Sequence, residues 1–278
     1  MVKKTLLILC ALCSAAWVDA QGLFPPVGAR STALGGASAA LCDMEAAADN
    51  VVGLAYVDRA GVGLSIRQNY MLNAMCYKSC FAAVPLSKVG AMGLTYTHFG
   101  TASFNEQKAS LAYAMLLGNK RQGKGVALGV RFDYLYMGTS DAHYTPQRAV
   151  TFAAGLQMRP ADDWCVGFQV LNPAVVPLQG TDGVSASATF RLGTSYRITT
   201  GFLGTIEIEK DLFHQPILRA GMEYGWREMF FVRTGISTSP GCYSFGLGYA
   251  HHDYHIDLAA QVHPTLGMTP QLSMAYQF

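Results

Sequence analysis

The chain has 278 residues, of which 51% are hydrophobic and 14% are charged, and its formal net charge is +2. A soluble domain usually carries about 25% charged residues, so this sequence has too few charges to cover a surface that faces water. The small net charge and the lack of lysine–arginine clusters in the sequence give no reason to expect nucleic acid as a partner.

Residues 1–20 have the layout of a secretory signal peptide. The basic pair Lys3–Lys4 precedes a short apolar stretch that begins at Leu6, and the segment closes on small residues at Ala20. The apolar stretch is too short to remain as a spanning helix, which needs about 20 residues. We therefore predict export and cleavage after Ala20, which makes Gln21 the first mature residue.

Residues 21–57 do not alternate between apolar and polar positions. The stretch Gly28–Leu41 is rich in small residues, and Asp43–Ala48 has a weakly helical composition. A segment of this kind before a set of strands is either a hatch inside a barrel or a disordered lead. Its apolar content favours the hatch, so we expect residues 21–57 to plug a barrel formed by residues 58–278.

From residue 58 onward, apolar residues recur at every second position, which is the period of β-strands. In residues 126–136, for example, Val130 belongs to one face, whereas Gly129 and Arg131 belong to the other. About fourteen such segments follow one another, and most have the roughly 9–11 residues of a tilted membrane strand. They are residues 59–69, 74–86, 89–99, 104–117, 126–136, 147–159, 163–171, 184–198, 201–210, 216–226, 228–237, 242–250, 253–263 and 271–278.

A soluble β-sandwich also alternates, but its outward face would be polar. Here one face holds glycine, alanine, serine and mixed charges, while the apolar face carries aromatic residues towards the strand ends, as membrane girdles do: Tyr134, Tyr136, Trp164, Tyr196, Tyr224, Trp226 and Tyr249. The terminal Phe278 resembles the C-terminal signal of outer-membrane barrels. We therefore predict an all-β fold, a transmembrane antiparallel β-barrel of about 14 strands with a small N-terminal hatch, in the lipid bilayer of the bacterial outer membrane.

The inward face of this barrel carries charges of both signs. The expected cations are Arg67, Lys78, Lys108, Arg131, Arg191, Arg197, Arg219 and Arg233, and the expected anions are Asp133, Glu207, Glu209, Glu223, Asp253 and Asp257. Because isolated buried charges are costly, we expect them to pair, with Arg131, Asp133, Arg191, Glu207, Arg219, Glu223 and Arg233 forming a lumen charge network. A charge-selective pore is the alternative interpretation.

The cysteines left after cleavage are Cys42, Cys76, Cys80, Cys165 and Cys242. Their odd number and wide spacing do not make a disulfide framework. On one strand, the α-carbons of Cys76 and Cys80 would lie about 13 Å apart, which is too far for a disulfide. We expect these thiols to be small packing side chains rather than redox switches.

Nothing in the sequence indicates an enzyme. His251, Asp253 and His255 share one strand face at a spacing that can chelate a metal, but a hydrophilic strand end is the simpler interpretation. The nucleophile elbow G-x-S-x-G does not occur in the sequence. We expect no catalytic residues, no metal and no cofactor.

Several short motifs resemble those of one family. The N-terminal segment contains A-R-x-x-A-L-G-G-A at Ala29–Ala37, and Asn50–Ala55 keeps the asparagine, leucine and alanine of an N-P-A-x-L-A box without its proline. Leu218–Gly225 and Phe231–Gly235 look like a G-x-E-Y and R-x-G strand pair. With these motifs the mature chain resembles the PorV/PorQ family of Bacteroidetes outer-membrane proteins, relatives of the FadL-like long-chain fatty acid transporters.

This resemblance implies a fourteen-stranded FadL-like barrel whose hatch motif is Ala29, Arg30, Leu34, Gly35, Gly36 and Asn50. It also implies a non-enzymatic role in type IX protein secretion, in which the barrel docks protein partners of the secretion machinery. The alternative is a FadL-like transporter of small hydrophobic molecules, which would need a hatch that moves and a lateral opening.

Overall fold

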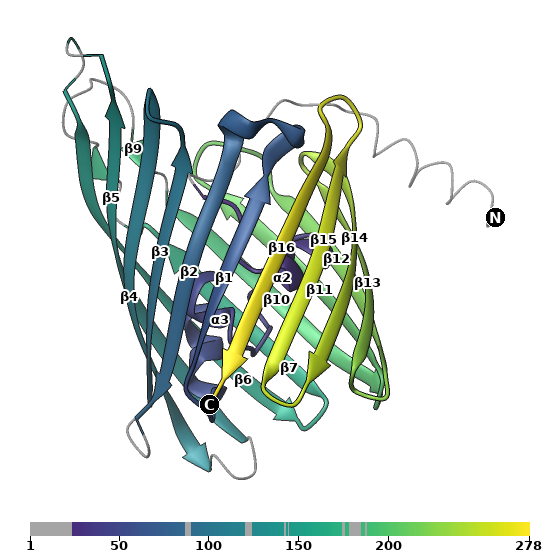
Figure 1. The fold of residues 1–278 in the computed structure, drawn as a ribbon. Coiled ribbons are helices and arrows are strands. Elements are labelled where there is room, and N and C mark those ends of the chain that lie inside the picture. The colour runs from purple at the N-terminus through teal and green to yellow at the C-terminus, as the bar shows by residue number, and fades with distance from the viewer. Residues whose placement is uncertain are drawn as a thin grey trace.

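The structure is a computed structural model that describes residues 24–86, 90–119, 124–141, 143, 145–173, 176–177, 185–186 and 188–278. The predicted signal peptide lies outside the described residues. Short helices come first and strands make up the rest (Figure 1). The helical elements are α2 (Ala29–Ala33), α3 (Ala46–Asp49) and the 3-10 turns η1 (Val51–Tyr56), η2 (Asn69–Met71) and η3 (Asn73–Met75). In the part of the chain that the structure describes, no helix is long and apolar enough to cross a membrane.

Fourteen of the described strands close into one antiparallel barrel. They are β1 (Gly61–Gln68), β2 (Cys76–Pro85), β3 (Ala91–Gly100), β4 (Phe104–Asn119), β5 (Lys124–Thr139), β6 (Gln147–Ala161), β7 (Trp164–Leu171), β10 (Thr189–Thr199), β11 (Phe202–Asp211), β12 (Ile217–Trp226), β13 (Phe230–Thr238), β14 (Gly241–His251), β15 (Tyr254–His263) and β16 (Gly267–Gln277). Each strand pairs with its neighbours in sequence, β7 pairs with β10, and β16 returns to β1. The predicted fold class is confirmed.

One predicted strand begins later than expected. The alternation places a strand at 184–198, but β10 starts at Thr189. Ser185–Ala186 instead forms β9, which pairs with β8 (Val176–Pro177) in a separate two-stranded sheet within the β7–β10 connection. Residues 185–186 fit the alternation of the predicted strand, but their backbone groups pair with β8 and not with a strand of the barrel.

The outer surface of the barrel is apolar over most of its height. Leu64, Val150 and Ile206 are each at least 60% exposed, and they belong to strands on different sides of the wall. Aromatic side chains gather at the end that holds the C-terminus, where the girdle residues predicted from the sequence include Trp164, Tyr196, Tyr224, Trp226 and Tyr249. A surface of this kind is stable only against lipid.

The two ends of the barrel differ in the length of their connections. Adjacent strands at the C-terminal end are joined by short turns such as 162–163 and 200–201, whereas the opposite end carries the longer connections 140–146 and 172–188. Membrane barrels place short turns in the periplasm and longer loops outside the cell. We use this rule to name the C-terminal end the periplasmic end.

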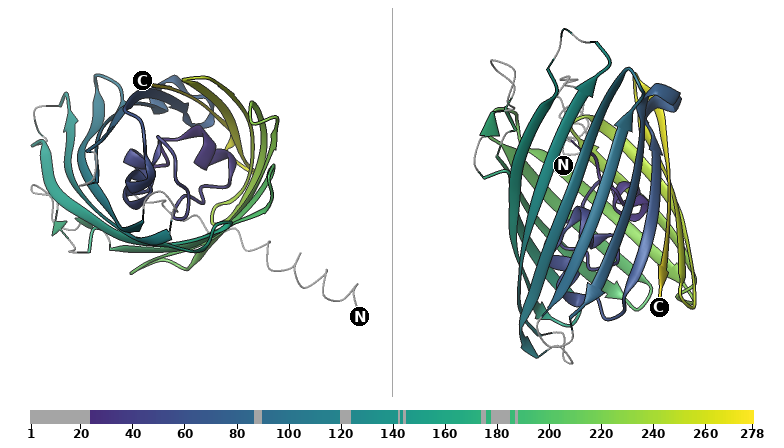
Figure 2. Two further views of the ribbon diagram at one scale, coloured as in Figure 1. Left: turned by 90° about the horizontal axis from the view of Figure 1, so that it is seen from below. Right: turned by 60° about the vertical axis from the view of Figure 1, so that its left-hand side comes forward.

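Residues 24–57 lie inside the barrel, and we call them the lumenal segment. Seen along the barrel axis, they occupy its centre as two lobes, one containing α2 and the other α3 and η1 (Figure 2). Small inward-facing side chains on the strands, such as Ala83, Ala112 and Ala153, leave space for these lobes. The wall is therefore shaped to fit a backbone rather than to interlock its own side chains.

Three expected lumen charges do not belong to the lumen. Lys78 lies on the outward face of β2, directly opposite the outward Ile66, so its assignment to the lumen was wrong. The alternation in this strand was read one residue out of phase. Asp253 lies in the β14–β15 turn and pairs with Arg59 at 2.6 Å. Arg197 is exposed at a register shift near the end of β10.

A single outward charge near mid-height tests this register. Leu247 faces lipid at the middle of β14, opposite Val232 and Leu258. We expect Leu247→Arg to lower the free energy of unfolding in a bilayer by about 2–4 kcal/mol, and Tyr254→Arg, at the periplasmic end of β15, by about 0–1 kcal/mol. Refolding titrations into lipid vesicles measure both values, and equal losses would contradict the assignment of these positions.

Candidate functional site

The lumenal segment is joined to the wall by an ion-pair network centred on Glu223. Arg30 of α2 donates from Nε and Nη2 to the two oxygens of Glu223, each at 2.8 Å, and from Nη1 to Asp43 at 2.8 Å. Arg233 donates to the same Glu223 at 2.6 Å and also pairs with Asp257. One wall carboxylate therefore joins a wall arginine to an arginine of the lumenal segment.

Strand register brings the other charges of this half of the lumen together. Arg191 lies directly opposite Glu209, and Glu207 lies directly opposite Arg219, so cross-strand pairs form between adjacent inward positions. The Arg191–Glu209 distance is 2.5 Å, and Arg219 contacts Glu209 at 2.7 Å and Glu207 at 3.2 Å. The free oxygen of Glu207 accepts from the backbone amides of Ser38 and Ala39 at 2.8 and 2.7 Å.

Two glycines of the lumenal segment follow α2 because the backbone turns there. Gly35 and Gly36 have φ angles of +74° and +86°, which side chains disfavour, and the Gly36 amide closes the helix by donating to Ser31 at 2.8 Å. A Cβ on wall residue Gly235 would lie 2.1 Å from the Gly35 nitrogen, and one on Gly221 would lie 2.7 Å from Leu34. The motif that carries the family resemblance is thus the place where segment and wall meet at backbone distance.

Asn50 organises the second half of the segment. Its side-chain amide donates to the carbonyl oxygens of Ala39 at 3.1 Å and Leu41 at 2.8 Å. Its oxygen caps η1 by accepting from Val52 N at 3.1 Å, and it also accepts from Gln169 of β7 at 2.5 Å. With 1% exposure, Asn50 has its donors and its acceptor satisfied, so no other residue type of its size could replace it here.

Arg131 and Asp133 stand apart from the network around Glu223. They lie on one face of β5 and pair with each other at 2.9 Å. Arg131 also donates to the carbonyl oxygen of Ala48, at the end of α3, at 2.6 Å. The structure thus divides the predicted charge network in two: this pair on β5 and the larger group on β10–β15.

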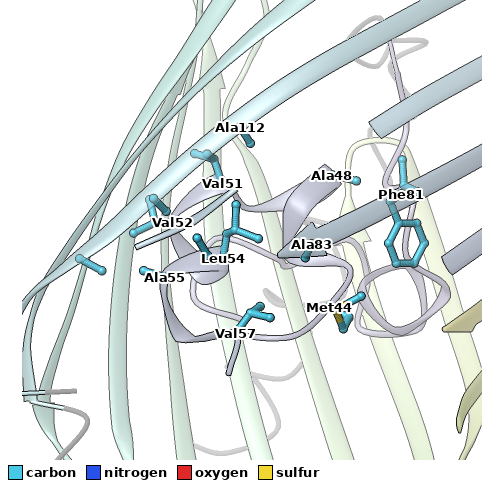
Figure 3. Close-up of a cluster of buried hydrophobic side chains, with 14 of the residues drawn as sticks. Met44, Ala48, Val51, Val52, Leu54, Ala55, Val57, Phe81, Ala83 and Ala112 are labelled. Carbon is cyan, nitrogen blue, oxygen red and sulfur yellow. The ribbon is translucent and has the colours of Figure 1, made fainter. Parts of the chain in front are cut away.

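On the β2–β5 side, the segment meets the wall through apolar side chains. Val51, Val52 and Leu54 of η1 are at most 1% exposed, and they pack towards the inward alanines of β2–β5 (Figure 3). Phe81, at 3% exposure, projects from β2 into the same cluster. Most lumen charges therefore lie on the β10–β15 side, whereas the β2–β5 side is mainly apolar and carries the Arg131–Asp133 pair.

The outer surface of this same wall carries a hollow. This apolar hollow of about 950 Å³ extends from β15 and β16 across β1–β6, where small residues such as Cys80, Ala82 and Ala109 are flanked by larger ones. Phe81 borders both the hollow outside and the apolar cluster inside. Its ring lies over Gly63 on the inner face, where a Cβ would approach the ring to 2.3 Å.

A small polar void lies within the segment itself, bordered by Asp43, Glu45, Asp49, Ser31 and Ser38, together with Leu41 and Asn50. Burial raises the pKa of Asp49, although its carboxylate accepts from Val27 N at 2.7 Å, Gly28 N at 3.0 Å and Ser31 Oγ at 2.6 Å.

Among these acidic residues, Glu45 lies in surroundings that disfavour its ionised form. Burial raises the pKa of Glu45 well above its usual range, and the nearby carboxylates of Asp257 and Asp43 raise it further. Ser273 donates to one of its oxygens, while the other has no hydrogen-bond partner among the described residues. Docking therefore favours the protonated form of this carboxyl group.

Sequence reasoning missed four residues that hold the segment: Asp43, Glu45, Asp49 and Gln169. Each acts through contacts with distant parts of the chain, and no local spacing signals them. The histidine group expected at a strand end behaves as a surface feature, because His251 stacks on Tyr249 and Asp253 pairs with Arg59. Across the described ranges, no cluster of histidine, cysteine and acidic residues has metal-binding geometry.

No protein-family model matches this sequence, and no curated protein matches it. Solved structures match its fold. A Pseudomonas aeruginosa FadL homologue superposes with a TM-score of 0.68 at 11% identity, over 93% of this chain and 100% of that one. The P. putida toluene transporter TodX gives 0.67 at 12% identity, over 94% and 99%. The Acinetobacter baumannii outer membrane protein Omp33 gives 0.54 at 8% identity, over 79% and 98%. The chain therefore has the fold of FadL-like outer-membrane barrels.

Glu45 makes docking of the lumenal segment depend on pH. The pKa of Glu45 is raised when the segment is docked. Below the usual pKa range of a carboxyl group, Glu45 is protonated in the docked and the undocked segment, so it does not change the free energy of docking. As the pH rises from that range towards the raised pKa, Glu45 ionises more readily in the undocked segment, and docking weakens. We expect Glu45→Gln to slow amide hydrogen exchange in residues 29–57 at pH 8 and to match the unmodified chain at pH 4 once intrinsic rates are corrected. Glu228→Gln, at an exposed turn, is the control, and faster exchange in Glu45→Gln at pH 8 would refute the argument.

Proposed function

We propose that this chain carries small apolar molecules across the bacterial outer membrane, with the lumenal segment as its hatch and without enzymatic chemistry. The observation that carries the proposal is the pairing of two apolar features on one wall. The apolar cluster around η1 lies inside β1–β5, and the hollow of about 950 Å³ lies outside it. An apolar molecule would be desolvated on both sides, which favours transfer into lipid.

The Phe81–Gly63 pair gives this transfer a place. Phe81 and Gly63 are directly opposite in the β1–β2 register, and the Phe81 ring fills the space that a side chain on Gly63 would take. Transfer from the cluster to the hollow would need displacement of this ring, a shift of η1 and a local parting of the β1–β2 ladder, which is continuous from Gly61 to Gln68. The fold supports the same proposal, because it is shared with the P. putida toluene transporter TodX.

Removing the Phe81 ring tests the route. We expect Phe81→Ala to speed entry of N-phenyl-1-naphthylamine into cells, because the ring no longer separates cluster and hollow. Cells that contain the unmodified protein should already take up this apolar dye faster than cells that lack the protein. Dye fluorescence measures the rate, and heat-modifiable migration on gels checks assembly, since losing a buried phenylalanine costs about 3–5 kcal/mol.

Phe245→Ala is the matched control, because Phe245 is an outward phenylalanine of β14, which does not border the hollow. This variant should leave the rate of dye entry unchanged. The transport proposal is rejected if dye enters at the same rate in three kinds of cell: those with the unmodified protein, those with Phe81→Ala and those without the protein.

Docking of protein partners in type IX secretion is the second candidate function, and PorV/PorQ-like motifs support it. A specific structural observation favours it as well: Gly35 and Leu34 meet the wall at backbone distance, and Arg30 is held by Glu223. A segment held this closely suits a rigid platform better than a gate.

Crosslinking in intact outer membranes, followed by mass spectrometry, tests the second candidate. We expect the longer external connections 140–146 and 172–188 or the periplasmic turns to crosslink to components of the secretion machinery. Crosslinks to lipid and to copies of this chain alone, together with positive dye transport, would leave transport as the function and reject docking.

A further inference from the structure

Two cysteines that are far apart in the sequence meet where the lumenal segment passes β7. Cys42 belongs to the segment, and Cys165 faces inward near the start of β7. The side-chain amide of Gln157 donates to Cys42 Sγ at 2.9 Å and to Cys165 Sγ at 2.6 Å. Both cysteines are free thiols in the structure, so one amide nitrogen bridges the two sulfur atoms.

The backbone of the lumenal segment comes close to the wall beside these cysteines. A Cβ on Gly167 would lie 1.8 Å from the carbonyl oxygen of Ala39, and Ser195 Oγ of β10 donates to the carbonyl oxygen of Ala40 at 3.0 Å. Cys165 is two residues from Gly167 on the same inward face and directly opposite Ser195, and Cys42 follows Ala40 by two residues. The segment therefore contacts β7 and β10 immediately before Cys42, next to the inward position of Cys165.

The surroundings of the two thiols favour thiol chemistry. The Arg159 guanidinium lies 3.9 Å over the ring of Tyr56 and near both thiols, so its positive charge would stabilise a thiolate there. The neighbouring Cys165 and then burial raise the pKa of the Cys42 thiol well above its usual value.

The other cysteines that the structure describes have no such arrangement. Cys80 points outward on β2, Cys76 lies four residues before it on the same strand, and Cys242 is buried on β14, opposite Ser237. Cys42 and Cys165 are thus the described pair that one side chain, Gln157, brings together between the lumenal segment and the wall.

We propose that Cys42 and Cys165 are a redox-controlled latch, which in its disulfide form ties the lumenal segment covalently to β7. Cys165 follows the 162–163 turn at the periplasmic end of the barrel, and in Gram-negative bacteria the periplasm is kept oxidising. The proposal does not depend on which molecule or partner the barrel serves.

The chemistry is thiol–disulfide exchange with a protein disulfide of the periplasm as oxidant, and it takes place while the lumenal segment is undocked, because Cys165 is only 7% exposed when the segment is docked. The Cys165 thiolate attacks one sulfur of the oxidant, forms a mixed disulfide and expels one thiolate. Cys42 then loses its proton and attacks the Cys165 sulfur, which releases the second oxidant thiolate. The two cysteines lose two electrons and two protons, and the oxidant becomes a dithiol.

The disulfide would hold the segment at the boundary between its two halves. Residues 29–41 are fixed by Arg30, Leu34 and the Glu207 contacts, whereas α3 and η1 follow Cys42 and pack on the apolar wall. Oxidation would add a covalent tie to a part of the segment that is held to β7 by the Asn50–Gln169 hydrogen bond. Reduction by a dithiol, which is itself oxidised to a disulfide, would remove that tie without disturbing the network around Glu223.

The test uses the full chain isolated from outer membranes, with free thiols blocked by N-ethylmaleimide under denaturing, non-reducing conditions. We expect mass spectrometry to find a peptide pair linked through Cys42 and Cys165, either as isolated or after treatment with oxidised glutathione. Cys76, Cys80 and Cys242 should carry N-ethylmaleimide. Blocked Cys42 and Cys165 in both preparations, or links to other cysteines, would overturn the proposal.

Hydrogen exchange tests the latch itself. We expect oxidation to slow amide exchange in residues 38–57 about tenfold or more relative to the chain reduced with dithiothreitol, and to have no such effect in Cys42→Ser or Cys165→Ser. Cys80→Ser is the matched control and should behave like the unmodified chain. A Cys42–Cys165 disulfide without slower exchange would reject the latch, and heat-modifiable migration identifies any variant that fails to assemble.

Discussion

The rest of this structure depends on one constraint: in lipid, every backbone amide and carbonyl of the wall must be paired within the sheet. Closure between β1 and β16 meets this constraint, and the period-two alternation then gives each residue a fixed side. Because inward and outward positions cannot be exchanged, the wall has few ways to accommodate a segment in its lumen. It does so by giving up side chains, as at Gly167, Gly221 and Gly235, so that the backbone of residues 34–40 fits against it.

The same alternation decides which charges meet. Glu207 and Arg219, like Glu223 and Arg233, are directly opposite across a strand pair, so both acid–base pairs follow from register alone. The lumenal segment uses this arrangement, because Glu223 also binds Arg30 and Glu207 also caps the Ser38 and Ala39 amides. Glu207 and Glu223 are thus each compensated by an arginine of the wall and by donors of the lumenal segment, which is the condition under which a buried charge is tolerated.

Strand periodicity allowed the barrel, and the inward or outward side of most of its residues, to be predicted. Alternation is a local property that each segment of the sequence carries. It failed at Lys78, where the face was read one residue out of phase, and at 184–198, where a small second sheet takes part of the segment. The contacts of Asp49 and Gln169, and the approach of Cys42 to Cys165, could not be predicted. Gln169 and Asn50, like Cys165 and Cys42, are separated by several strands that only the closed fold brings together, and Asp49 bonds to residues 18 to 22 positions earlier in the lumenal segment.

The two halves of the lumenal segment differ in what holds them to the wall. Separating Arg30 from Glu223 breaks two charge-assisted hydrogen bonds, each worth about 1.5–3 kcal/mol. Moving η1 away from β2–β5 instead exposes apolar surface, and an apolar ligand or a lipid chain can offset that cost by covering the same surface. The α2 half is thus the fixed end of the segment and the η1 half is the end that a ligand can displace, with Cys42 and Asn50 at the junction between them.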